Sequence, residues 1–188
     1  MDTRRKKRFI KIAEAVAAVA VGAAALFFGW RYAERKWIYP LKYEECVSRC
    51  SAAFGLDSSL VYALIKTESG FDERAESRAG ALGLMQLTPK TAAFVAVKLG
   101  AKEYDLFDAD TNILFGSYYL WYLSRRFKET ATVLAAYNAG EGNVSSWLKD
   151  ENYSADGVTL KKIPYGETRA HVKKTLKFKE KYESIHGL

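Results

Sequence analysis

The sequence predicts a mainly α-helical domain behind a single N-terminal transmembrane helix. Three observations indicate this architecture. An apolar segment directly follows a cluster of basic residues near the N-terminus. From Tyr43 onward, apolar residues recur at helical spacing in one segment after another, separated by glycine, proline and short polar stretches. Strand-like runs are too few for a real sheet, and 188 residues leave room for one core of ordinary size.

Residues 1–31 are predicted to form a basic cytoplasmic tail and a transmembrane anchor, with residues 9–30 in the membrane. The uncharged run from Ala15 to Trp30 is shorter than the ~20 residues that usually span a bilayer. Counting from Phe9 gives a sufficient span, because Lys11 can extend its ammonium group back to the lipid head groups. The basic flank should stay in the cytoplasm, so we expect the rest of the chain to be exported.

A cleaved signal peptide is the competing interpretation of this segment. Small residues such as Ala23 and Ala25 lie inside the apolar run, however, and the bulky residues 26–30 follow them without a good cleavage site. An uncleaved anchor is therefore favoured over a signal peptide, and the basic flank argues against a buried core helix.

Residues 32–42 are predicted to be a juxtamembrane connector that ends near Pro40. Cys46 and Cys50, the only cysteines, are four residues apart on the next predicted helix. At that spacing their Cβ atoms would be ~5–6 Å apart, which is too far for an unstrained disulfide. We expect two free, partly buried thiols, with a strained or intermolecular bridge as the alternative. No further Cys or His lies at metal-ligand spacing, so no metal site is predicted.

The domain itself is predicted over residues 43–188. Asp57 is placed to cap one helix, Thr88 followed by Pro89 caps another, and glycines such as Gly55 and Gly100 end helices. Residues 71–84 and 149–162 are predicted to be loops or irregular hairpins. The expected helices are 43–54, 58–69, 89–99, 108–127, 130–137, 143–148 and 166–185.

The formal net charge is +7, and it is unevenly distributed. Besides the basic N-terminus, five lysines cluster on the last predicted helix, at positions 173, 174, 177, 179 and 181. This cluster has two interpretations, a solvated helix face and an attraction to anionic lipid or wall polymers. Nucleic acid is not a predicted partner, because no aromatic surface is interleaved with the basic charge.

Glu68 is the strongest candidate for a catalytic group. It continues the apolar stripe formed by Leu60, Val61, Leu64 and Ile65 at the end of a predicted helix. A carboxyl group on an apolar face is costly to ionise, so this position favours the protonated form that a general acid needs. Taken alone, the pattern also fits an exposed glutamate at a helix end.

Three further segments follow later in the sequence. They are Gly83-Leu84-Met85-Gln86-Leu87-Thr88-Pro89, Ala135-Ala136-Tyr137-Asn138-Ala139-Gly140 and Pro164-Tyr165-Gly166-Glu167-Thr168-Arg169. Together with residues 63–71, they resemble the catalytic domain of the soluble lytic transglycosylase (SLT) family. The resemblance covers about residues 39–178. It implies a lysozyme-like fold of the goose-lysozyme and lytic transglycosylase type, and cleavage of the glycan strands of bacterial peptidoglycan.

The resemblance assigns the chemistry to Glu68. In the family, the matching glutamate protonates the bridging oxygen and then takes a proton from the 6-hydroxyl of the same N-acetylmuramic acid, giving a 1,6-anhydro product. The substrate's N-acetyl group is thought to replace a second carboxylate, which is an exception among glycosidases. Asp72, Glu73 and Glu76 lie in a polar loop and could supply a second carboxylate, although nothing in their spacing requires one.

The resemblance also implies a set of substrate-binding residues. Tyr137 can orient the carboxyl group of Glu68 by a hydrogen bond, or it can be a core aromatic whose hydroxyl has another partner. Met85 fits a core position as well as a sugar contact. The residues at two positions differ from those usual in the family. Thr88 is explained as a helix cap. His171 could shift the pH optimum if it lies near Glu68. The implied residues are Ser69, Ser77, Gly83, Met85, Gln86, Tyr137 and Asn138.

The predicted protein is thus a peptidoglycan lytic transglycosylase without a cofactor, held in the bacterial cytoplasmic membrane by a single pass, with its catalytic domain on the extracytoplasmic side. Regulatory envelope proteins are possible partners. A hydrolytic muramidase on the same fold and a non-catalytic glycan-binding envelope protein remain alternatives, and so does an adaptor whose anchor is the functional part.

Overall fold

The structure, a computed structural model, describes residues 3–188. Residues 1 and 2 of the predicted tail lie outside them. The chain divides into two compact units, Met1–Pro40 and Leu41–Leu188. Among the described residues there are helices and no strands, which confirms the predicted mainly α class. The predicted domain boundaries at residues 31 and 42 stay predictions.

The first unit is one long helix, α1 (Thr3–Ala33), which continues into a π-helical turn, η1 (Glu34–Ile38). Helical structure therefore extends into the predicted connector, because no glycine or proline lies between Trp30 and Pro40. Between Lys6 and Ile38 this helix is long and apolar enough to cross a membrane. The apolar stretch is not buried within the protein, as expected of a segment whose hydrophobic partner is lipid.

The second unit consists of seven helices, and most of their ends agree with the predicted caps. Asp57 accepts a hydrogen bond from the backbone of Ser59, and Thr88 accepts one from the backbone of Thr91. Gly55 and Gly100 end their helices in the left-handed conformation. The helices are α2 (Glu44–Phe54), α3 (Ser58–Glu68), α4 (Pro89–Leu99), α5 (Ala109–Arg126), α6 (Thr130–Ala139), α7 (Glu141–Leu148) and α8 (Gly166–His186).

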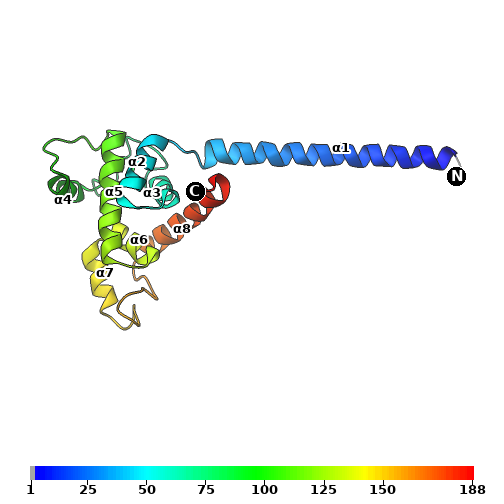
Figure 1. The fold of residues 1–188 in the computed structure, drawn as a ribbon. Helices are drawn as coiled ribbons and strands as arrows, with labels where there is room; N and C mark the ends of the chain where they lie inside the picture. The colour runs from blue at the N-terminus through cyan, green and yellow to red at the C-terminus, as the bar shows by residue number, and fades with distance from the viewer. Residues whose placement is uncertain (1–2) are drawn as a thin grey trace. The chain divides into compact units, whose positions relative to one another are not determined.

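Helix α3 lies at the centre of this unit. All residues from Ser59 to Ile65 are buried, so this part of the helix is covered on every side and not only along the predicted stripe. It packs against α2 and most extensively against α8, which also contacts α6 (Figure 1). Tyr62 of α3 stacks on Tyr182 of α8 with ring centroids 5.3 Å apart. The buried middle of α3 thus fixes the position of its C-terminal end.

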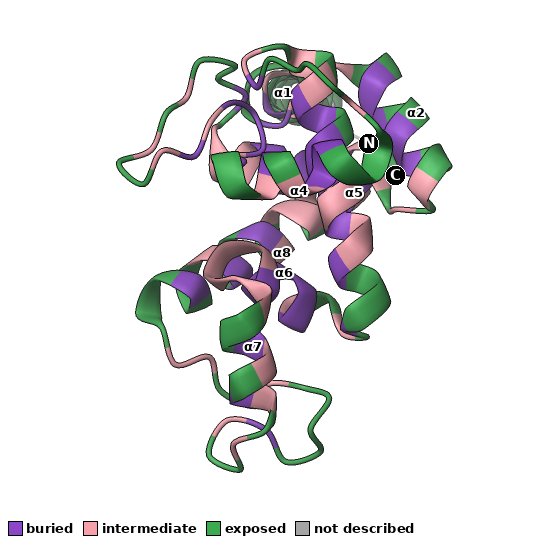
Figure 2. Cartoon of the chain, turned by 90° about the vertical axis from the view of Figure 1, so that its left-hand side faces the viewer, coloured by how far each residue is buried: buried purple, intermediate pink, exposed green. Residues whose placement is uncertain are grey.

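A second cluster of buried residues joins α4 and α5 to the loop before them, and includes Leu87, Val95 and Phe115. The loop after α7 is mostly exposed (Figure 2). Residues 76–87 form an irregular hairpin with isolated bridges from Leu82 to Glu76 and to Leu87. Cys46 and Cys50 are buried free thiols, as predicted.

Candidate active site

Glu68 is the last residue of α3, at the point where the buried helix reaches the surface. The next residue ties the helix end to the hairpin, because the Ser69 hydroxyl donates to the Leu84 carbonyl oxygen at 2.8 Å and accepts from the Phe71 backbone amide at 3.1 Å. Gly70 then turns the chain with a φ of 63°. The position of the Glu68 carboxyl group is therefore fixed by both the helix and the loop.

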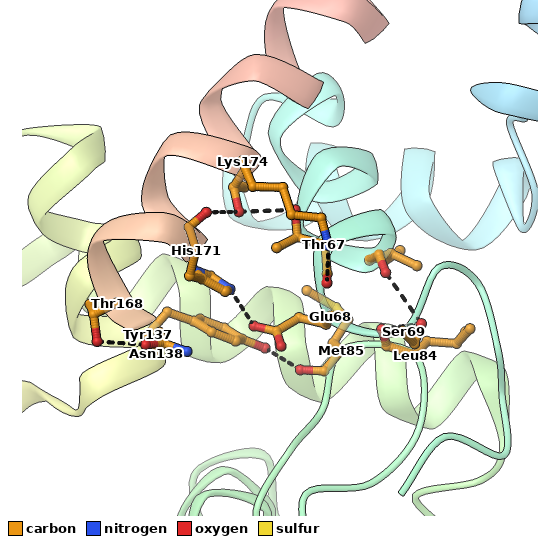
Figure 3. A network of polar contacts seen from close by, with 12 residues as sticks. Thr67, Glu68, Ser69, Leu84, Met85, Tyr137, Asn138, Thr168, His171 and Lys174 are labelled. Carbon is orange, nitrogen blue, oxygen red and sulfur yellow. Dashed lines mark hydrogen bonds and ion pairs between the residues drawn. The ribbon is translucent and has the colours of Figure 1, made fainter. Parts of the chain in front are cut away.

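His171 of α8 is the hydrogen-bonding partner of Glu68 (Figure 3). Its Nε2 atom lies 2.9 Å from Oε1 of Glu68. The two side chains are only 9% and 13% exposed, respectively. The sequence marked His171 as a departure from the family pattern but gave no sign that it contacts the acid, because the two positions belong to helices far apart in the chain.

Of the two interpretations of Tyr137, the hydrogen bond to Glu68 is wrong, and a hydroxyl with another partner is what the structure has. The Tyr137 hydroxyl donates instead to the Met85 carbonyl oxygen at 2.9 Å. That carbonyl belongs to a fully buried residue and needs a donor. Burial, and next the nearby charge of Glu68, raise the pKa of Tyr137 well above its ordinary value. The phenol therefore keeps its proton and stays a donor to Met85 at neutral pH.

Replacement of Tyr137 by Phe is expected to lower stability by about 1–3 kcal/mol, because a buried carbonyl group loses its donor. The aromatic ring, which lies 5.4 Å from that of Tyr119, is retained in this variant. Thermal unfolding measures the effect, with Tyr104→Phe at an exposed position as the control. An unchanged melting temperature for Tyr137→Phe would show that the hydroxyl does not support the Met85 backbone.

Asn112 of α5, which no sequence pattern singled out, supports the loop beside Glu68. Its Oδ1 accepts from the Met85 backbone amide at 2.8 Å, and its Nδ2 donates to the carbonyl oxygens of Leu82 and Leu106 at 3.0 and 2.7 Å. A Cβ on Gly83 would lie 2.3 Å from that Nδ2. Gly83 therefore allows the close approach of Asn112, whereas a close approach to sugar stays a prediction.

Met85 and Gln86 follow in the same loop. Met85 is fully buried, and its sulfur occupies the space that a Cβ on Gly116 would need, at 2.3 Å. The Gln86 side-chain amide donates to the carbonyl oxygens of Ala75 and Gly83 at 3.1 and 3.0 Å, and so closes the loop on itself. These contacts make Met85 a core residue and Gln86 a loop support, and their contacts with sugar stay predictions.

Ser77 and Asn138 also have partners within the protein. The Ser77 hydroxyl accepts from the Ala81 backbone amide at 3.0 Å, inside the hairpin. Asn138 Oδ1 accepts from the Thr168 hydroxyl at 2.7 Å and links α6 to α8 (Figure 3). The structure thus brings the motif segments together around Glu68 through contacts with backbone and with one another.

A pocket of about 440 Å³ opens between α4, α5 and the start of α7. The ring of Tyr119 forms part of its wall and also contacts Tyr137, so the pocket lies next to the Glu68 region. Aromatic walls combined with charged groups provide both the apolar surface and the polar contacts that orient a bound ligand. The lining residues are Lys90, Thr91, Phe94, Tyr119, Tyr122, Gly140, Glu141 and Gly142.

Comparison with known proteins gives matches to lytic transglycosylases. The family model "Transglycosylase SLT domain" matches residues 45–158. The soluble lytic murein transglycosylase of Salmonella typhimurium is 32% identical over 164 residues, which are 84% of this chain and 25% of that protein. The membrane-bound lytic murein transglycosylase C of Mannheimia succiniciproducens is 38% identical over 117 residues, which are 55% of this chain and 32% of that protein.

Among solved structures, the 70 kDa soluble lytic transglycosylase of Escherichia coli aligns with a TM-score of 0.70 and 30% identity. The alignment covers 79% of this chain and 25% of that one. The predicted lysozyme-like, lytic-transglycosylase fold is thereby confirmed. The chain spans about a quarter of the length of the soluble relatives that it matches.

Proposed function

Because this chain belongs to the transglycosylase SLT domain family, we propose that it cleaves the β-1,4 bond between N-acetylmuramic acid and N-acetylglucosamine in peptidoglycan, with Glu68 as its single general acid and base. The observation that carries this proposal is the position of Glu68. Its side chain is only 13% exposed and lies where the motif segments meet, and Tyr137 of one such segment contacts Tyr119 in the wall of the aromatic pocket. Such a group can deliver a proton where water is largely excluded.

The proposed reaction needs one proton and no water. Glu68 donates its proton to the bridging oxygen as the bond from that oxygen to the anomeric carbon breaks. The resulting carboxylate then takes the proton of the 6-hydroxyl group as its oxygen bonds to the same anomeric carbon. The product carries a 1,6-anhydro ring, and Glu68 is again protonated for the next cycle.

The candidates for a second carboxylate have local roles instead. Glu73 Oε1 accepts a hydrogen bond from the Tyr43 hydroxyl at 2.6 Å, and Asp72 Oδ1 accepts from the Arg74 backbone amide at 2.9 Å. Both side chains and that of Glu76 are exposed. These features favour a single-carboxylate transglycosylase over a hydrolytic muramidase, which would use a second carboxylate to activate water.

The same proposal places the enzyme at the bacterial cytoplasmic membrane. The apolar helix between Lys6 and Ile38 and the membrane-bound relatives support membrane association. We infer a single pass through residues 9–30, with the basic end in the cytoplasm and residues 43–188 outside it, where peptidoglycan is found. Anchoring would raise the local concentration of the domain at the wall, and regulatory envelope proteins could restrain it there.

A product assay tests the reaction type. Purified peptidoglycan is digested in H₂¹⁸O with the full chain in detergent, and the fragments are analysed by mass spectrometry. We expect 1,6-anhydro-muramic acid ends without ¹⁸O, because the 6-hydroxyl group replaces water as the nucleophile. A commercial hydrolytic muramidase provides the positive control for ¹⁸O uptake. Reducing ends that carry ¹⁸O would reject the transglycosylase and support the muramidase.

A further inference from the structure

Within the described residues, the Glu68 and His171 pair contains one fully buried polar atom without a partner. Nδ1 of His171 is buried and has no hydrogen bond in the part of the chain that the structure describes, whereas Nε2 faces Oε1 of Glu68 at 2.9 Å. The two ring nitrogens therefore have different environments. This difference decides which of them carries the proton.

A proton on Nδ1 would be a buried donor without an acceptor, which is rarer in proteins than a buried acceptor without a donor. The imidazolium form would carry the same unpaired donor and, beside the protonated Glu68 of the acid form, an unpaired buried charge. The neutral form with its proton on Nε2 avoids both costs. In this form Nε2 donates to Oε1 of Glu68, and the bare Nδ1 is the atom left without a partner.

The tautomer determines where Glu68 carries its own proton. Oε1 already accepts from His171, so the proton of the acid form belongs on Oε2. Oε2 has no hydrogen-bond partner among residues 3–188 and points away from the imidazole (Figure 3). Tyr137 cannot donate a hydrogen bond to Oε2, because its hydroxyl already donates to the Met85 carbonyl oxygen.

We propose that His171 is a positioning residue, which as the neutral Nε2–H tautomer holds Oε1 of Glu68 and leaves the acidic proton on Oε2, directed at the substrate. The inference rests on the proposed role of Glu68 as the acid. His171 keeps its proton throughout the reaction. Its hydrogen bond strengthens as Glu68 becomes a carboxylate, because a charged acceptor is stronger than a neutral one.

Contacts between α3 and α8 hold the pair in register. Thr175 Oγ1 lies 3.0 Å from Thr67 Oγ1 and 3.0 Å from the His171 carbonyl oxygen. Lys174 Nζ donates to the Thr67 carbonyl oxygen at 3.3 Å (Figure 3). Thr67 directly precedes Glu68, so the helix that carries the histidine is bonded to the residue next to the acid. The geometry of the pair is thus a property of the helix packing.

Kinetics on peptidoglycan test the positioning role with His171→Leu and His171→Gln in the full chain. We expect His171→Leu to lower kcat by about 10- to 100-fold, as for loss of a hydrogen bond to a charged group, with little change in KM. His171→Gln should recover most of the loss, since its amide can donate to Oε1. Equal kcat in wild type and His171→Leu, or equal losses in both variants at unchanged melting temperature, would overturn the proposal.

NMR of the ring nitrogens tests the tautomer directly. The chain has two histidines, so a His186→Gln background isolates the signals of His171. We expect a neutral ring with the proton on Nε2 at the pH of maximal activity; a proton on Nδ1, or an imidazolium, would overturn the proposal. The measurement needs no turnover. A wild-type chain that does not cleave peptidoglycan would therefore refute the proposed function, while the NMR result still decides the tautomer.

Discussion

Replacement of Glu68 by Gln is expected to lower the rate of peptidoglycan cleavage by about 10²- to 10⁴-fold, the usual contribution of a general acid or base. An amide has almost the shape of the carboxyl group but cannot release a proton to the bridging oxygen. Its oxygen can still accept from Nε2 of His171, so the contact between α3 and α8 should survive. We therefore expect a near-normal melting temperature together with the loss of activity.

Two matched variants separate this effect from a general loss of charge. Glu76→Gln removes an exposed carboxylate from the hairpin near Glu68, and Glu151→Gln removes one from the exposed loop after α7. Both should retain wild-type rates. A large loss in Glu76→Gln would indicate a second catalytic carboxylate. Wild-type activity in Glu68→Gln would refute the assignment of the acid, and no activity in the wild type would favour a non-catalytic glycan-binding protein.

The helices were predictable because their signals are local. Asp57, Thr88 and Asp108 all cap helices through their side chains, as residues of this type do next to an apolar periodic segment. The helix ends that were predicted a few residues away from their actual position have weaker sequence signals. Helix α6 continues through Asn138 to Ala139, because only Gly140 adopts a backbone conformation that the helix cannot continue.

The candidate site was predictable as a set of segments but not as a set of contacts. The catalytic role of Glu68 was predicted from the apolar stripe and the motif around it. Its hydrogen bond to His171 and the three hydrogen bonds of Asn112 join elements distant in sequence. No local pattern indicates such pairs. For the same reason the sequence could not identify Met85 as the acceptor of the Tyr137 hydroxyl, since the direction of the Met85 carbonyl depends on how the hairpin packs.

Replacement of Gly83 by Ala should give the largest loss of stability, about 3 kcal/mol or more. Its φ of 73° is unfavourable for an L-residue by about 1–2 kcal/mol. The added Cβ would also lie 2.3 Å from the Leu106 carbonyl oxygen and from the Asn112 side chain, and overpacking of this kind costs about 1–3 kcal/mol. Thermal and denaturant unfolding of the full chain in detergent measure the change.

Gly80→Ala is the matched control, because Gly80 has a similar φ of 74° in the same hairpin but open space around the position of a Cβ. It should cost only the backbone contribution, about 1–2 kcal/mol. The difference between the two variants therefore measures the contact with Asn112 and Leu106. Equal losses would mean that the loop can move away from Asn112 at little cost. In that case the Asn112 hydrogen bonds would not be what holds Met85 beside Glu68.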